Sequence, residues 1–435
     1  MSQPGRRPRS AGGTRPLARS LGVCALVMVA VGPGAPPRPA EARDLWVDGE
    51  RSVVLRTWLK SSVVISRFAD DRQLFPVREG GESLWRVRLE PEWRFSRAGK
   101  LAVTYEHRMR LAPSAGGSPP IAGALPLESP APYRLRPLDR AVITEPGFSW
   151  RHEIDRGYLA LHRAGAEITI GRQAVGWGRG VLFGAVDLFS PFSPLEADRE
   201  WRRGVDALRA DVRLRERLSL DAVAALGETI DGSAFATRLR GYVGEVDGEL
   251  VLGWRARDRM VGVTSSAVAG EAELHGEVAW FHTSDALPGG TRDAVKAVVG
   301  GSYRLGLGPG VPVFVEYHYS DFGVARAGEV DDAFADPAWR ERYVRGDTQI
   351  LGRHAAAVLA HCELSPEWTL SGTMLLSPTD GSGVVTPGAS LRLGDRIAVH
   401  ATAYLPFGAR PRDGSLRSEY GATPIAGFLQ VSVYD

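Results

Sequence analysis

The sequence predicts an all-β fold: a transmembrane, antiparallel, up-and-down β-barrel of about 16 strands, with 18 possible, that follows a cleaved signal peptide. Three observations lead to this prediction. The N-terminus has the charge and hydropathy pattern of an export signal. The rest of the chain alternates between apolar and polar residues with a period of two. No apolar run beyond the N-terminus reaches the roughly 18 residues that a transmembrane helix needs.

Residues 1–42 have the composition of a signal peptide. Five arginines between Arg6 and Arg19 make the start of the chain positive, and residues 21–31 form an apolar run too short to cross a bilayer as a helix. Residues 40–42 match the A-x-A pattern of a cleavage site. We therefore expect this segment to be removed during export. An uncleaved N-terminal anchor is the alternative.

The charge of the mature chain gives no reason to expect a nucleic-acid partner. Residues 1–42 carry six Arg and one Glu, or +5, so the total of +2 leaves about −3 for residues 43–435. One cysteine, Cys362, then remains, which excludes an intrachain disulfide and a thiolate metal site. We expect no metal and no cofactor.

Alternation is clear along most of the mature chain. It is seen in residues 101–111, 204–214, 217–226, 250–257 and 396–405. About 16 to 18 such segments occur, each near the roughly 9–11 residues that a tilted strand needs to cross a bilayer. Their polar faces are rich in Arg, Asp and Glu, which suits a wet lumen better than a packed interior because unpaired buried charge is costly.

A single domain over residues 43–435 fits this pattern best. A series of soluble β-sandwiches is the alternative, but we find no helical segment, no linker and no repeat of about 100 residues. A closed barrel also leaves no free strand edge. Turn signals such as Asp231-Gly232 and Asp247-Gly248 separate many strands. The longer polar connections fall at about 111–150, 174–203, 284–292 and 324–350.

One long motif resembles a known family. The stretch "IGRQAVGWGRGVLFGAVDLFSPFSP", followed by "RRGVDALRADVRL", is similar to the pattern GRQ-x-x-x-WG, D-L-F-x-P-F and GVDALR of a poorly characterised family of bacterial outer-membrane, porin-like β-barrels. The matching residues are Gly171, Arg172, Gln173, Trp177, Gly178, Asp187, Leu188, Phe189, Pro191, Phe192, Gly204, Val205, Asp206, Ala207, Leu208 and Arg209.

The resemblance covers most of the mature chain. It implies a barrel integral to the bacterial outer membrane, but no known substrate, because the activity of the family is not established. The chain departs from the family at Ala185-Val186, where relatives tend to have Asn-Pro. It also ends in Asp435, where outer-membrane barrels usually have an aromatic residue that the assembly machinery reads.

The loop at 174–203 is the candidate functional segment. Loops of this length are usually functional, and its apolar residues must pack on something, so we expect it to fold toward the barrel wall or lumen. Its charged side chains either line a constriction, where they would set an ion preference, or form a structural clamp that fixes strand register through salt bridges. The candidate residues are Arg172, Gln173, Trp177, Arg179, Asp187, Glu200, Arg202, Arg203 and Asp206.

Three functions are compatible with such a barrel. The first is a porin-like channel for small hydrophilic solutes, and the second is a plugged structural or docking component of an envelope export or lipid-handling system. The third, a barrel hydrolase, is disfavoured because the nine His have no metal-ligand spacing and no G-x-S-x-G motif occurs. Glu316 and His318 share a strand face, but we expect a lumen-facing polar pair there and no catalytic residues. The expected partners are outer-membrane lipid, the barrel assembly machinery during insertion and, for the docking alternative, periplasmic proteins.

Overall fold

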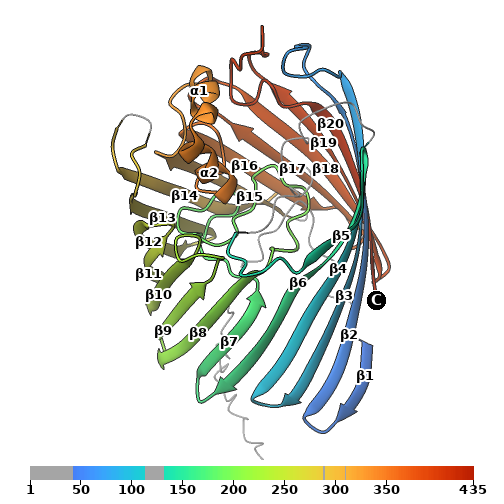
Figure 1. Cartoon of the computed structure of the whole chain (residues 1–435), viewed down its shortest axis with the longest axis vertical. Helices are drawn as coiled ribbons and strands as arrows, with labels where there is room; N and C mark the ends of the chain where they lie inside the picture. Colours follow the sequence, from blue (N-terminus) through green and yellow to red (C-terminus); the bar gives the residue numbers. More distant parts are fainter. Residues whose placement is uncertain (1–42, 113–131, 288–289, 309) are drawn as a thin grey trace, which may run out of the picture.

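The alternating segments form one closed sheet (Figure 1). The structure is a computed structural model and describes residues 43–112, 132–287, 290–308 and 310–435; the predicted signal peptide lies outside the described residues. Neighbouring strands are antiparallel, and β20 closes the barrel against residues 58–67 of β2. The strands are β1 (Arg43–Asp48), β2 (Arg51–Arg67), β3 (Glu79–Ser96), β4 (Gly99–Leu111), β5 (Asp139–Glu145), β6 (Phe148–Arg163), β7 (Ala166–Gln173), β8 (Val205–Arg215), β9 (Leu218–Ala225), β10 (Ala234–Val243), β11 (Val246–Arg255), β12 (Asp258–Ala269), β13 (Ala272–His282), β14 (Asp293–Leu305), β15 (Val311–Ser320), β16 (His354–Glu363), β17 (Trp368–Leu376), β18 (Gly383–Leu393), β19 (Ile397–Phe407) and β20 (Ile425–Tyr434).

These strands make an 18-stranded barrel because two pairs of them lie end to end. Along one edge of β2, β1 pairs with residues 51–55 and β20 with residues 58–67. Along one edge of β6, β5 pairs with residues 148–153 and β7 with residues 157–163. The predicted barrel is confirmed, and its strand number lies at the upper predicted value.

The two rims of the barrel differ. Turns of a few residues, such as 97–98, 164–165 and 244–245, join strands at one rim, whereas the opposite rim carries long connections such as 174–204 and 321–353. In outer-membrane barrels the short turns face the periplasm and the long loops face outside. The predicted long connection at 111–150 is partly wrong. It contains β5 and the start of β6, and β5 was missed because seven residues are too few to cross a bilayer.

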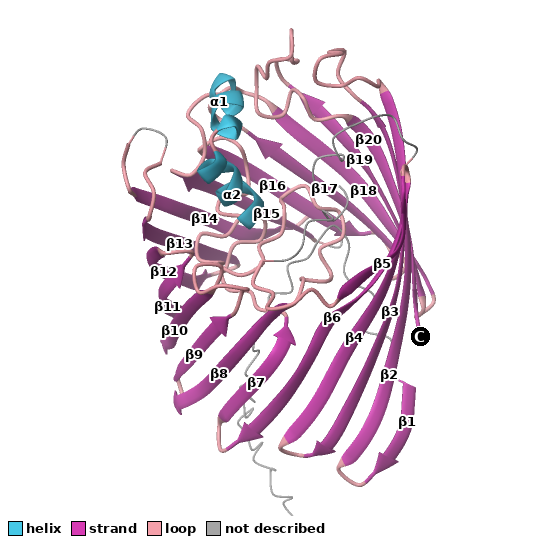
Figure 2. Cartoon of the chain, in the orientation of Figure 1, coloured by secondary structure: helices cyan, strands magenta, loops and turns pink. Residues whose placement is uncertain are grey.

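The expectation of no helical segment is also wrong. The connection 321–353 contains a 3-10 turn (Ala327–Glu329) and the short helices α1 (Val330–Ala335) and α2 (Pro337–Arg345), which Figure 2 shows near the long-connection rim. The Asp336 side chain caps α2 by accepting a hydrogen bond from the Ala338 amide. Helices of six and nine residues are too short to give a recognisable 3.6-residue period. In the part of the chain that the structure describes, no helix is long and apolar enough to span a membrane.

The outer face of the barrel is an apolar belt. Large apolar side chains remain exposed there, for example on β11 to β14: Leu250, Leu252, Val261, Val263, Val278 and Val299. Outward aromatic residues lie toward both rims, with Trp85, Trp254 and Trp280 near the long connections and Trp93, Tyr303 and Trp368 near the short turns. An apolar band between two aromatic girdles is the surface of a membrane-spanning barrel.

Candidate functional site

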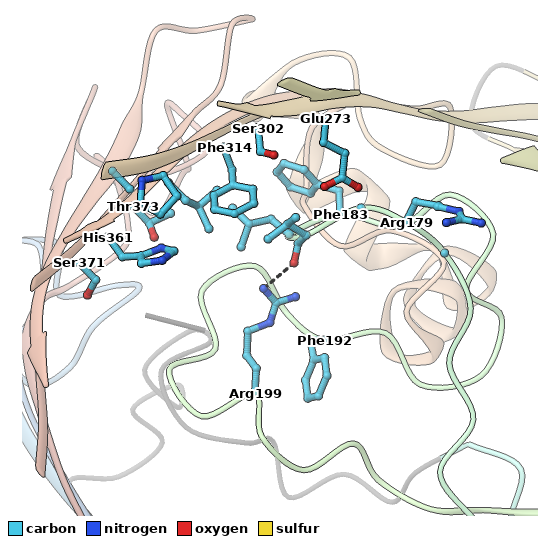
Figure 3. A pocket seen from close by; sticks show the side chains of 18 of the residues that line it. Arg179, Phe183, Phe192, Arg199, Glu273, Ser302, Phe314, His361, Ser371 and Thr373 are labelled. Atoms are coloured by element: carbon cyan, nitrogen blue, oxygen red, sulfur yellow. Dashed lines mark hydrogen bonds between the residues drawn. The ribbon is translucent and has the colours of Figure 1, made fainter. Parts of the chain in front are cut away.

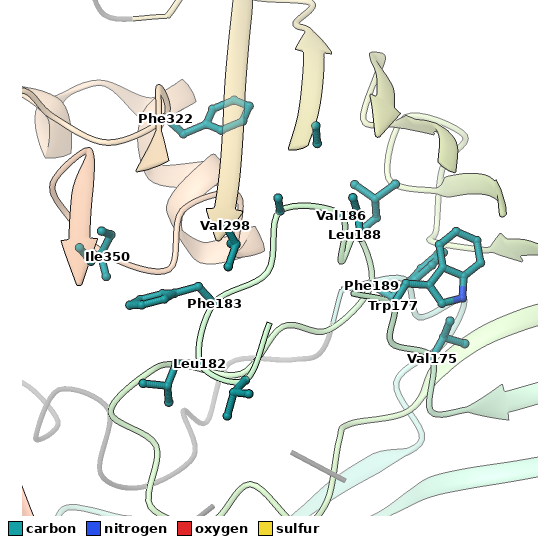
Figure 4. Packing of buried hydrophobic residues seen from close by; sticks show 14 of the residues in the cluster. Val175, Trp177, Leu182, Phe183, Val186, Leu188, Phe189, Val298, Phe322 and Ile350 are labelled. Atoms are coloured by element: carbon teal, nitrogen blue, oxygen red, sulfur yellow. The ribbon is translucent and has the colours of Figure 1, made fainter. Parts of the chain in front are cut away.

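The connection 174–204 folds into the barrel and is packed there (Figure 1). Phe183 and Phe189 have exposed fractions of 2% and 0%. Figure 4 shows Phe183 beside Val298 of β14, and Trp177 beside Phe189 on the other side of the cluster. Full burial of such a side chain contributes about 1.5–3 kcal/mol each, so the loop occupies a defined position and does not drift in the lumen.

The residues at the root of the loop join its two strands. Arg172 of β7 forms an ion pair with Asp206 of β8 at 2.7 Å. The Gln173 side-chain amide donates to the backbone oxygens of Thr169 and Ala207 at 3.2 and 3.1 Å. Both candidate residues of the GRQ motif therefore fix strand register at the point where the loop begins.

Two glycines of the motif permit close backbone approach at the same place. Gly171 has a φ of +120°, and a Cβ there would lie 2.3 Å from the Gly157 carbonyl oxygen. A Cβ at Gly204 would lie 2.1 Å from the Asp155 carbonyl oxygen. No other residue fits either position without moving the strands.

Glu277 of β13 holds the first half of the loop by its backbone. Its carboxylate accepts hydrogen bonds from the amides of Arg179, Gly180, Ala185 and Val186, with Gly180 at 2.9 Å and Ala185 at 2.7 Å. Glu277 is 1% exposed, so the hydrogen bonds replace the water that the carboxylate loses. The wall carboxylate thus takes the place of backbone acceptors for these four loop amides.

Glu316 of β15 holds the adjoining turn in the same way. It accepts from the amides of Val181, Leu182 at 2.9 Å and Phe183 at 3.3 Å. The fourth contact is His275 Nε2, 2.9 Å from Glu316 Oε1. Two buried wall carboxylates thus satisfy seven loop amides.

The far end of the loop is bound to the opposite wall by charge. Lys60 of β2 lies 2.8 Å from an Asp198 oxygen and 2.7 Å from Glu200. Arg86 of β3 reaches Asp198 at 3.4 Å, and Lys60 Nζ lies 3.9 Å from the centroid of the Trp201 ring. The loop therefore crosses the lumen from β13–β15 to β2–β3.

Two more candidate residues contact the wall on β9 to β11. Trp177 Nε1 donates to Asp221 at 3.0 Å, and the Arg238 guanidinium lies 5.1 Å from the Trp177 ring centroid. Arg179 forms ion pairs with Asp247 and with Glu249, the latter at 3.1 Å. These contacts join the loop to a charged network on the lumen face of the strands.

The remaining candidates act within the loop. Asp187 and Arg202 form an ion pair with each other. Arg203 is held near Arg108 and Arg134, and burial, together with these two positive charges, lowers the pKa of Arg203 to about 10. The nine candidates therefore lie on the loop or on the ends of β7 and β8 that flank it. Most of them form hydrogen bonds or ion pairs with residues of the barrel wall or of the loop.

A cavity of about 610 Å³ lies between the loop and the wall formed by β12 to β17. Figure 3 shows Arg199 and Phe192 on the loop side. Ser302, Phe314 and His361 lie on the strand side, and the Phe314 and His361 rings stack with centroids 6.2 Å apart. Aromatic rings therefore line both sides of the cavity, and arginines of the loop add positive charge.

The wall residues that bind the loop were missed in the sequence. Glu277 and Glu316 look like ordinary inward-facing positions of alternating strands, and nothing in the sequence marks them as partners of the loop amides. Glu316 and His318 do face inward as expected, but Glu316 binds His275 and the loop. In the described part of the chain, both ring nitrogens of His318 lack a hydrogen-bond partner, and its ring lies 5.0 Å from Phe183. No group of three or more potential metal ligands occurs among the described residues.

Comparison with known proteins gives the fold. No family model and no curated protein matches the chain in sequence. The solved structure of OccAB1 from Acinetobacter baumannii is similar at a TM-score of 0.54 and 9% identity, over 92% of this chain and 99% of that one. OccK9 (OpdG) from Pseudomonas aeruginosa is similar at a TM-score of 0.53 and 10% identity, over 88% of this chain and 98% of that one. Together with the apolar belt, this agrees with the predicted location as an integral β-barrel of the bacterial outer membrane.

Proposed function

We propose that the protein is a porin-like, non-enzymatic channel for small hydrophilic solutes, and that the loop 174–203 narrows its passage. The observation that carries this proposal is the cavity of about 610 Å³ between the loop and the wall. A loop that served only to fill the lumen would have no reason to leave this space beside charged groups. Rings of charged side chains at a narrowing set ion preference in pores.

The lumen walls on both sides of the loop are charged, which supports passage of water and polar solutes. Arg209 and Arg238 pair with Asp221 on one side, at 2.9 and 3.0 Å. Arg86 and Arg88 pair with Glu106 on the other, both at 3.0 Å. Arg209, with 29% of its side chain exposed, offers hydrogen-bonding surface to a solute, whereas Arg88 and Glu106 are buried and pair so that neither charge is left unpaired.

Single-channel conductance of the full chain in a planar bilayer tests the proposal. The barrel is refolded in detergent, and folding is checked first by heat-modifiable gel mobility. Discrete conductance steps, with faster swelling of liposomes in small sugars than in large ones, are the expected result. A folded barrel that gives neither would contradict a channel.

A plugged docking component is the second candidate, and the density of loop contacts favours it. The seven amide contacts with Glu277 and Glu316 fix the loop. The connection 321–353 also approaches it closely, because a Cβ at Gly346 would lie 2.9 Å from Pro191. A folded, silent barrel that co-purifies with periplasmic proteins would support this function and reject the first.

We further propose that the chain belongs to the porin-like family that its motif resembles, and that it meets outer-membrane lipid and the barrel assembly machinery during insertion. The Asp435 backbone forms two hydrogen bonds of 3.0 Å with Thr57, which extend the pairing of β20 with β2.

A further inference from the structure

A basic and aromatic patch interrupts the apolar belt on β4, β5 and β6. Glu106 of β4 is buried in the lumen, so its neighbour His107 faces outward. His107 pairs in register with His152 of β6, and His152 pairs with Arg140 of β5. Residues paired across antiparallel strands lie on the same face, so these three side chains share the outer surface and are called the outer patch below.

The outer patch lies within the belt, not above it. Trp85 and Trp150 flank Met109 in the girdle near the long connections, and the patch is the next outward position toward the membrane centre, about 7 Å along the strand. The equivalent positions below Trp254 and Trp280 are Leu252 and Val278, which are both apolar and exposed. The patch therefore places polar groups where other strands contact lipid chains.

The contacts within the patch leave it with hydrogen-bond donors. The Trp150 Nε1–H can only donate, and it lies 3.4 Å from His107 Nδ1, so His107 carries its proton on Nε2. The Tyr105 hydroxyl lies 2.8 Å from His152 Nδ1. Arg140 is exposed, and within the described residues its side chain forms no hydrogen bond or ion pair. A guanidinium and an imidazole N–H are hydrogen-bond donors, so they suit a ligand whose polar atoms are hydrogen-bond acceptors.

We propose that the outer patch binds a phosphate group of an outer-leaflet lipid. The patch is the outward position next to the aromatic girdle at the rim of long connections, the rim that faces outside in outer-membrane barrels, so a headgroup phosphate of the outer leaflet lies within reach of a long side chain. Arg140 reaches such a phosphate by extending along the apolar surface toward the interface. A symmetric contact with a second copy would instead bring like charges together, which is unfavourable.

Binding of bis-phosphorylated lipid A to the refolded full chain in detergent, counted by native mass spectrometry, tests the proposal. Arg140→Gln should weaken binding about fivefold, the effect of one basic residue near an anionic membrane surface. Arg163→Gln is the matched control, because Arg163 is exposed at the opposite end of β6, beside the short turn 164–165 and away from the patch. It should bind as the wild type does.

A comparison of lipids needs no variant and covers the case in which Arg140→Gln fails to fold. Wild-type protein should retain bis-phosphorylated lipid A and lose most binding when both phosphates are removed. Equal binding of the two lipids, or equal binding by wild type and folded Arg140→Gln, would overturn the proposal. Displacement of the lipid by millimolar inorganic phosphate would indicate a site for soluble anions. A dimer that dissociates in Arg140→Gln would indicate that the patch binds a second copy of the chain. Either result would also overturn the proposal.

Discussion

Glu316→Gln should release the loop from the wall of β15. The Glu316 carboxylate accepts from Val181 and His275 on one oxygen and from Leu182 and Phe183 on the other. A glutamine keeps one acceptor oxygen and turns the other position into a donor, so two of these hydrogen bonds are lost whichever way the amide faces. Hydrogen bonds to a charged group contribute about 1.5–3 kcal/mol each, so docking of the loop should weaken by about 3–6 kcal/mol.

Hydrogen exchange of the loop amides measures this effect. A loss of about 3–6 kcal/mol predicts exchange about 10² to 10⁴ times faster at Val181, Leu182 and Phe183, while the strands stay protected. Glu90→Gln is the control, because Glu90 pairs with Arg88 at 2.7 Å and its side chain has no contact with the loop among the described hydrogen bonds. Unchanged loop exchange in a folded Glu316→Gln protein would refute the reasoning.

Three further predictions concern the end of β7 where the loop begins, the contact of the loop with β9, and the connections at the rim of long loops. Gly171→Ala should lower the yield of folded, heat-modifiable barrel, because its Cβ would lie 2.3 Å from the Gly157 oxygen; normal yield would contradict this. Trp177→Phe should lower the free energy of unfolding by about 1–3 kcal/mol in urea, because the hydrogen bond to buried Asp221 is lost; no change would show that the bond is dispensable. Burial raises the pKa of Glu419 to about 7, so the stability of the segment that buries this carboxyl should be fully present below about pH 4.5 and be lost as pH rises through 7, although the 351–352 amides themselves favour the charged form. Protection of these amides that does not change with pH, after correction for intrinsic exchange, would contradict this.

The strands could be predicted because charged residues that face the lumen alternate along each strand with apolar residues that face lipid. Their number was harder to predict, because β1 and β5 occupy only parts of a strand position and periodicity does not reveal end-to-end pairing. Asp247-Gly248 was wrongly predicted as a turn. It lies inside β11, Gly244 with a φ of +64° lies in the preceding turn, and Asp247 pairs with Arg179 and Arg240.

The sequence identified the loop but not its partners. The apolar content of residues 182–192 required a packing surface, which located the candidate segment. Its anchors Glu277, Glu316 and Lys60 lie roughly 100 residues or more from the amides and carboxylates that they bind. Hydrogen bonds over such separations depend on how the barrel closes, and alternation alone does not specify that.

Single-channel conductance of wild-type and Glu316→Gln protein, side by side, tests the central claim most directly. Point substitution is preferable to deletion here, because removing residues 178–189 would also remove Phe183 and Phe189 from the lumen core. If the loop narrows a channel, the wild type should give discrete steps, and Glu316→Gln should give larger or more frequently fluctuating ones. Folded barrels that are both silent, or that conduct identically although the loop is released, would contradict it.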